Sequence, residues 1–170
     1  MLQKSKKAEI IKGLEESIKG SPSIIFVNFH GMKVSDETQL RRDLRNKGVN
    51  YKVSRKTLLK RALKGAAEGE LPELSGEVAM AYLPVLAEVL EDTKDNIAPA
   101  REVYNFQKSH KGSLNILGGI FEGKFIGATK MMEIAMIPSR EVLYAQFVNL
   151  INSPIQRFVV ALDQIAKSKN

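Results

Sequence analysis

The stretch LRRDLRNKGVNYKVSRKTLLKRA, residues 40–62, decides the fold because its hydrophobic period changes twice. Leu40 and Leu44 stand four residues apart among charged neighbours, which is typical of one face of an amphipathic helix, and Gly48 is a common helix stop. Residues 49–53 (VNYKV) then alternate between apolar and polar side chains, which is the period of a strand. The stretch therefore predicts a helix, a strand and a second helix in close succession, and it indicates the α/β class.

Both helices of this unit are predicted to begin at a serine. Ser35 is placed to cap the first helix, and Asp36 and Glu37 follow it in the first turn, where the helix dipole favours negative charge. Ser54 is placed to cap the second helix. The predicted inner face of the second helix consists of four apolar residues, namely Leu58, Leu59, Ala62 and Leu63.

Further elements are predicted on either side of this unit. Before it, residues 8–18 have the spacing of an amphipathic helix, and the apolar run 23–29 (SIIFVNF) predicts a strand buried on both faces. The elements predicted after it are a strand at 77–83, helical segments at 85–89 and 99–106, and a hairpin of 114–121 and 124–126 around the turn Glu122-Gly123. We therefore expect a mixed-sheet α/β sandwich domain over residues 1–130, followed by a long C-terminal helical segment over residues 131–170.

The positive charge of the chain is concentrated in its first third. Residues 1–65 contain 16 Lys and Arg against 6 Asp and Glu, a net charge of +10, whereas residues 66–170 contain 10 against 13, a net charge of −3. Between residues 41 and 64 ten basic side chains stand against the single acid Asp43. Such a density of positive charge is typical of a surface that binds a polyanion.

Two interpretations of this basic segment remain open, a solvated surface without a ligand and an RNA-binding surface. The charge extends over a helix, a strand and another helix without compensating acids, which favours RNA. Aromatic residues do not alternate with the cations, so folded RNA bound through its backbone and shape is favoured over single strands. His30 fits an RNA contact and a plain loop residue equally well. The predicted RNA-binding residues are Lys6, Lys7, His30, Lys33, Arg41, Arg42, Arg45, Lys52, Arg55, Lys56, Lys60 and Arg61.

The last segment of the chain carries a long apolar stripe. After the candidate cap Ser139, apolar residues recur at alternating spacings of four and three, which is the pattern of a helix that packs against other helices. The stripe either completes the core of the first domain or binds a partner protein, and its breadth favours a partner. Ser153 and Pro154 are expected to interrupt the helix as a cap and a first helical residue, giving two docking segments. The predicted partner-binding residues are Tyr144, Phe147, Val148, Ile151, Ile155, Phe158, Val159, Leu162 and Ile165.

The sequence does not indicate an enzyme, a metal site or a cofactor. It has no Cys, and its two His residues stand in no metal-ligand spacing. Residues 118–124 (GGIFEGK) resemble a phosphate-binding loop, but Phe125 replaces the Ser or Thr that would bind magnesium, so a hairpin turn is expected instead. With neither a secretory signal nor a membrane-spanning run in view, we expect a soluble protein of the cytoplasm.

Several motifs in fixed order carry a resemblance to a known family. They are FHGMKV (residues 29–34), the block 40–62, a strand with Ala79 and Tyr82, GGIFEGKFI (118–126), and a terminal helix after IPS (137–139). Together they resemble the L-ten family of bacterial large-subunit ribosomal proteins over essentially the whole chain. Three positions depart from the usual pattern of that family, namely His30, Lys33 and Lys56.

The resemblance implies a structural protein of the large ribosomal subunit that anchors the ribosomal stalk. The N-terminal α/β domain would bind large-subunit ribosomal RNA at the base of the stalk, beside ribosomal protein L-eleven. The C-terminal helix would recruit dimers of the acidic stalk protein L-seven/L-twelve, two of them if each Phe-led unit (147–150 and 158–162) binds one. The dimers would attract translational GTPases. Two other functions stay open: an RNA-binding ribosome-assembly factor of the same fold, and repression of its own messenger.

Overall fold

The computed structural model describes residues 4–84, 95–110, 112 and 114–169. The chain divides into two compact units, Met1–Ile137 and Pro138–Asn170, and each is described by itself. The helical segment predicted at 85–89 lies outside the described residues.

The first unit is built on a five-stranded sheet with the order β2-β3-β1-β4-β5. All four pairings between neighbouring strands are antiparallel, and a single parallel bridge joins Glu68 to Lys124 beyond the named strands. The apolar β1 lies at the centre because its run of buried residues needs cover on both faces. The strands are β1 (Ser23–Asn28), β2 (Asn50–Val53), β3 (Val78–Tyr82), β4 (Asn115–Phe121) and β5 (Lys124–Gly127).

Helices cover both faces of this sheet. Alternate residues of β1 point to opposite faces, so Ile24 and Phe26 pack with α1 and α3, whereas Ile25 and Val27 pack with α2, α4 and α5. The predicted α/β sandwich is therefore confirmed. The helices of the first unit are α1 (Lys4–Lys19), α2 (Val34–Asn46), α3 (Lys56–Ala62), α4 (Ala98–Ser109) and α5 (Ala128–Ala135).

The predicted serine caps of α2 and α3 are wrong. The N-cap of α2 is Lys33, and the hydroxyl of Ser35 donates to the carboxylate of Asp36 instead. The N-cap of α3 is Arg55, whose carbonyl accepts from the backbone N–H groups of Leu58 and Leu59, while the N–H of Ser54 donates to the carbonyl of Val78 and so continues the pairing of β2 with β3. Neither N-cap makes a side-chain capping bond.

The predicted hairpin near residue 122 is confirmed as β4 and β5. Glu122 and Gly123 both have positive φ, 50° and 76°, as the two central residues of a type I′ turn require. The helix that follows, α5, is not predicted as a separate element, because residues 131–135 are expected from the sequence to belong to the C-terminal helical segment. Its residues Met131 and Ala135 are buried in the core, so the first unit ends at Ile137, seven residues after the boundary expected from the sequence.

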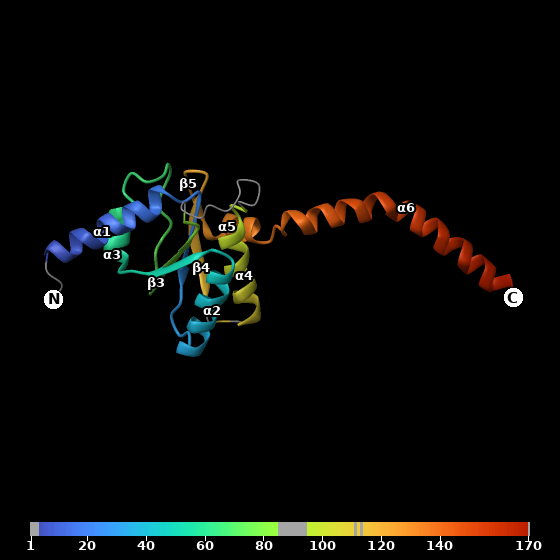
Figure 1. Ribbon diagram of the computed structural model, residues 1–170, viewed down its shortest axis with the longest axis horizontal. Helices are drawn as coiled ribbons and strands as arrows, with labels where there is room; N and C mark the ends of the chain where they lie inside the picture. Colours follow the sequence, from blue (N-terminus) through green and yellow to red (C-terminus); the bar gives the residue numbers. More distant parts are fainter. Residues whose placement is uncertain (1–3, 85–94, 111, 113, 170) are drawn as a thin grey trace. The chain divides into compact units, whose positions relative to one another are not determined.

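The second unit consists of one long helix, α6 (Arg140–Lys169), after Pro138 and Ser139. The backbone N–H of Leu143 donates to the Ser139 carbonyl, and Val142 N–H donates to the Ser139 hydroxyl at 3.5 Å, so Ser139 caps the helix as predicted. The predicted interruption at Ser153-Pro154 is wrong, because Pro154 lies inside the continuous helix. Figure 1 shows α6 as one ribbon that changes direction about midway.

Candidate nucleic-acid and protein interfaces

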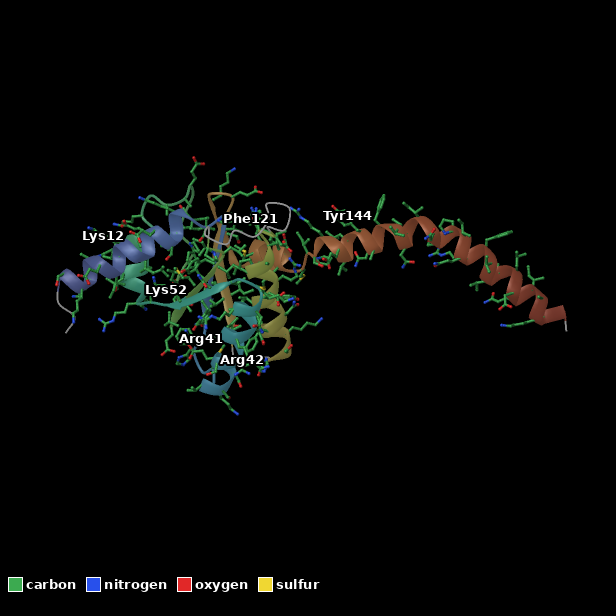
Figure 2. The ribbon with its side chains drawn as sticks, in the orientation of Figure 1. Lys12, Arg41, Arg42, Lys52, Phe121 and Tyr144 are labelled. Atoms are coloured by element: carbon green, nitrogen blue, oxygen red, sulfur yellow. The ribbon has the colours of Figure 1, made fainter. Side chains whose placement is uncertain are left out.

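Three basic side chains of the first unit, Arg41, Arg45 and Lys52, lie at the outer edge of β2. This strand ends the sheet, with α2 on one face and α1 and α3 on the other, and among the described residues no strand pairs with its outer edge. Arg41 and Arg45 come from α2, and Lys52 comes from β2 itself. Figure 2 shows Arg41 and Arg42 on α2 and Lys52 on β2. The Nζ of Lys52 donates to the carbonyl of Gly13 at 3.3 Å, which ties the edge strand to α1.

A hollow of about 400 Å³ lies at this edge, which we call the edge hollow. It contains three of the predicted RNA-binding residues, Arg41, Arg45 and Lys52. Its remaining lining comes from β2 with the residue before it, and from β3, namely Val49, Asn50, Tyr51 and Tyr82. The sequence did not predict Tyr82 as part of this hollow. Tyr82 of β3 lies opposite Asn50 of β2, and a pairing between strands that are far apart in the sequence leaves no local pattern.

Arg41 is held in place by two neighbours. Its Nη2 lies 2.6 Å from the carboxylate of Glu37, one helical turn earlier, and Nε donates to the same oxygen at 3.2 Å. The guanidinium also lies over the ring of Tyr51, with Cζ 5.0 Å from the ring centroid, a cation–π contact. An arginine fixed on two sides loses little conformational freedom when it binds a ligand.

Tyr51 has a hydroxyl that is buried and has no hydrogen-bond partner among the described residues. Burial raises the pKa of this phenol well above its ordinary value, the nearby Glu37 carboxylate raises it further, and the Arg41 cation opposes both. Tyr51 is therefore neutral at every physiological pH.

Two more predicted residues, Arg55 and Lys56, line a second hollow of about 440 Å³ at the end of β2, which Glu77 also lines. His30 lies close by, with its Nδ1 3.9 Å from the Glu77 carboxylate. The structure does not bring the other predicted cations into either hollow. They are Lys6, Lys7, Lys33, Arg42, Lys60 and Arg61, all of them exposed except Lys7, which is half-buried.

The large apolar residues of α6 are exposed. The nine predicted partner-binding residues have exposed fractions between 50% and 69%, far above what a core residue has. Four further apolar residues of α6 are exposed in the same way, namely Val142, Leu143, Leu150 and Val160. Within its own unit, α6 has no other element to cover these side chains.

No helix among the described residues is both long enough and apolar enough to cross a membrane. In the same part of the chain, no three His, Asp or Glu side chains gather as metal ligands would.

Comparison with known proteins places the chain among ribosomal proteins. The family model described as ribosomal protein L10 matches residues 2–96, and the model of the ribosomal protein uL10 C-terminal region matches residues 137–170. The large ribosomal subunit protein uL10 of Alkaliphilus metalliredigens (strain QYMF) is 34% identical over 96% of this chain and 93% of its own length. The proteins of the same name from Bacillus cereus (strain B4264) and Bacillus anthracis (strain A0248) are each 32% identical over the same shares.

The chain belongs to the ribosomal protein L10 family. It is accordingly a structural protein of the large ribosomal subunit, part of the cytoplasmic ribosome of bacteria, and not an enzyme. The resemblance inferred from the sequence motifs is thereby confirmed.

Proposed function

We propose that the protein joins two different partners in the large ribosomal subunit. The first unit binds large-subunit ribosomal RNA at the base of the stalk, beside ribosomal protein L-eleven, and α6 holds dimers of the acidic stalk protein L-seven/L-twelve. These dimers in turn attract translational GTPases. The observation that supports the proposal is the chemical division of the chain: its excess positive charge lies in residues 1–65, and most of its exposed large apolar residues are on α6.

The RNA half of the proposal is supported by the placement of the cations. Ten basic residues lie between residues 41 and 64, and those in the edge hollow come from α2 and β2 together. Side chains of Lys and Arg that neutralise phosphates release the counterions condensed on RNA, so binding falls as salt rises. Arg and Lys on several elements can contact phosphates that follow the curved surface of a folded RNA.

The protein half is supported by the length and exposure of α6. Exposed apolar surface of this extent is rarely left uncovered in a soluble protein, and it marks a site of protein association. Phe147 and Phe158 head two similar units 11 residues apart, which is about 16 Å along a helix at 1.5 Å per residue. This repeat is the basis for proposing two stalk dimers per chain. Because Pro154 does not end the helix, the two units lie on one continuous element.

Native mass spectrometry of the chain coexpressed with the acidic stalk protein tests the protein half. We expect one chain with two dimers, and we expect Phe147→Asp with Phe158→Asp to abolish the complex because two charges would be buried in an apolar interface. Asn149→Asp with Gln156→Asp is the matched control. These positions add the same charge, but at 100° per residue they fall on the opposite side of the helix from Phe147 and Phe158.

A complex with one dimer or three would overturn the proposed number. No complex at all, with the RNA binding intact, would leave an RNA-binding assembly factor of the same fold as the better description.

A further inference from the structure

The edge hollow has the features of a site for a single nucleotide. We propose that it takes one unstacked nucleotide of the ribosomal RNA, whose base stacks on the guanidinium of Arg41 and whose phosphate lies between Arg45 and Lys52. The inference rests on the proposed RNA binding of the first unit and adds to it the kind of nucleotide that is bound.

Arg41 suits a base better than a phosphate. Its charge is already paired with Glu37, whose carboxylate occupies the Nε and Nη2 edge of the guanidinium at 3.2 and 2.6 Å. Tyr51 supports the guanidinium from one side, while 47% of the Arg41 side chain is exposed. Unstacked RNA bases commonly stack on the planes of arginine guanidinium groups. A planar group that is neutralised, supported and half exposed provides such a surface.

The other two cations of the hollow, Arg45 and Lys52, can pair with the phosphate. Within the part of the chain that the structure describes, neither Arg45 nor Lys52 forms an ion pair. Among the described residues, the Lys52 ammonium donates one hydrogen bond, to the neutral carbonyl of Gly13, which positions it and leaves two of its protons for a ligand. Arg45 and Lys52 therefore place two uncompensated charges at a hollow whose third cation is already paired.

The size and the polar lining of the hollow also fit one nucleotide. A volume of about 400 Å³ is enough for a single nucleotide. Asn50 is exposed in the lining, and its amide can both donate to and accept from the edge of a base. In a paired A-form segment the bases stay stacked inside the helix, so a nucleotide that enters the hollow comes from a bulge or a loop.

Binding of the full chain to deproteinised large-subunit ribosomal RNA tests the inference through Arg41→Lys. Lysine keeps the positive charge but has no plane on which a base can stack. We expect the affinity to fall about tenfold, the effect of one stacked base, while the slope of log affinity against log salt stays unchanged. The matched control is Arg157→Lys, the same substitution at an exposed arginine of α6 that is neither in the hollow nor among the predicted RNA-binding residues, and we expect it to change the affinity less than twofold.

A second measurement follows the bound nucleotide directly, through the chemical modification of its base. With the wild-type chain bound, we expect at least one unpaired base of the RNA to be protected from a reagent that modifies base edges. With Arg41→Lys bound at saturation, the same base should react again. Equal affinities for Arg41→Lys and Arg157→Lys, together with an unchanged protection pattern, would overturn the inference and leave RNA binding intact. Failure of the wild-type chain to bind this RNA at low salt would instead overturn the proposed function.

Discussion

At the scale of single residues, Gly119 shows how tightly the first unit is packed. It lies on β4 opposite Ile25 of β1, and a β-carbon added there would clash with the Ile24 carbonyl oxygen and come within 2.5 Å of the Met131 methyl group on α5. The Ile24 oxygen belongs to the central strand of the sheet, so the clash cannot be relieved by turning a side chain. The absence of a side chain at this position is therefore a packing requirement.

We predict that Gly119→Ala lowers the free energy of unfolding by about 2 kcal/mol, within the range that overpacking costs. The check is a denaturant titration followed by circular dichroism. Gly13→Ala is the control, because a β-carbon there meets only the Lys52 ammonium at 3.9 Å. In the middle of α1, alanine should stabilise the helix by up to about 1 kcal/mol. Equal unfolding midpoints for the two variants would contradict this account of the packing.

Tyr51 gives a second prediction at this scale. Its buried hydroxyl has no partner among the described residues, so Tyr51→Phe should leave the stability unchanged or raise it by up to about 1 kcal/mol. The raised pKa fixes the sign of the pH dependence. Above a pH of about 10 the unfolded chain loses the phenol proton and the folded chain keeps it, so alkali favours unfolding.

Unfolding midpoints measured between pH 8 and pH 11 would test this prediction. The wild-type midpoint should fall more steeply above pH 10 than that of Tyr51→Phe. Parallel curves for the two proteins would show that the Tyr51 hydroxyl reaches solvent and titrates normally.

At the scale of elements, local periods predicted most of the helices and strands, whereas pairings and caps depended on distant residues. The spacing of Leu40, Leu44 and the inner face of α3 correctly predicted that they are buried. A helical period can be recognised from residues that are close together in the sequence. The cap predicted at Ser54 is wrong: the carbonyl of Arg55 accepts the first bonds of α3, and Ser54 extends the strand pairing through its N–H to Val78, 24 residues away. The short α5 was missed because it follows β5 directly and has no side-chain cap.

The candidate interfaces divide in the same way. The run of cations and the apolar stripe are local patterns, so the sequence could nominate those residues, and their binding roles stay predictions. The edge hollow could not be predicted, because it depends on the register that sets Asn50 opposite Tyr82 and on α2 lying over Tyr51. Its contacts join residues that no short motif connects.

The position of Pro154 inside α6 leads to a prediction about the stability of this helix. Proline has no N–H, so it cannot donate to the carbonyl of Leu150 as another residue at that position would. We predict that Pro154→Ala increases the helical signal of the full chain at 222 nm and slows amide exchange between residues 150 and 158. Gln156→Ala, a change to the same residue in the same stretch, should do neither to a comparable extent. Unchanged exchange in Pro154→Ala would mean that the proline costs this helix nothing.

At the scale of the whole molecule, two kinds of surface imply two kinds of binding that fail independently. We predict that Arg41→Glu with Arg55→Glu weakens binding to large-subunit ribosomal RNA and leaves the stalk dimers bound. Phe147→Asp with Phe158→Asp should do the reverse. Filter binding measures the RNA and native mass spectrometry measures the dimers. If either folded variant lost both partners, the division of functions between the two units would be wrong.

Salt should separate the same two activities in the wild-type chain. Raising it from 50 to 200 mM should weaken the RNA complex by orders of magnitude if six or more phosphates are contacted. Binding through α6 buries apolar surface, which monovalent salt at these concentrations hardly affects. A steep loss of the dimers over this range would show that charge dominates at α6 as well.

The two edge strands of the sheet, β2 and β5, have a consequence for the newly made chain before it reaches a ribosome. Open strand edges invite identical chains to add to the sheet and aggregate. At β5 the edge is partly closed, since the N–H of Phe125 donates to the Glu68 carbonyl and the N–H of Glu68 donates to the Gly123 carbonyl. The edge of β2 is protected by electrostatic repulsion instead. If two chains paired along this edge, Lys52 and the neighbouring arginines of one chain would lie against the same cations of the other. The charges proposed to hold RNA would thus also protect the unassembled protein against polymerisation, and that protection would be weakest in concentrated salt.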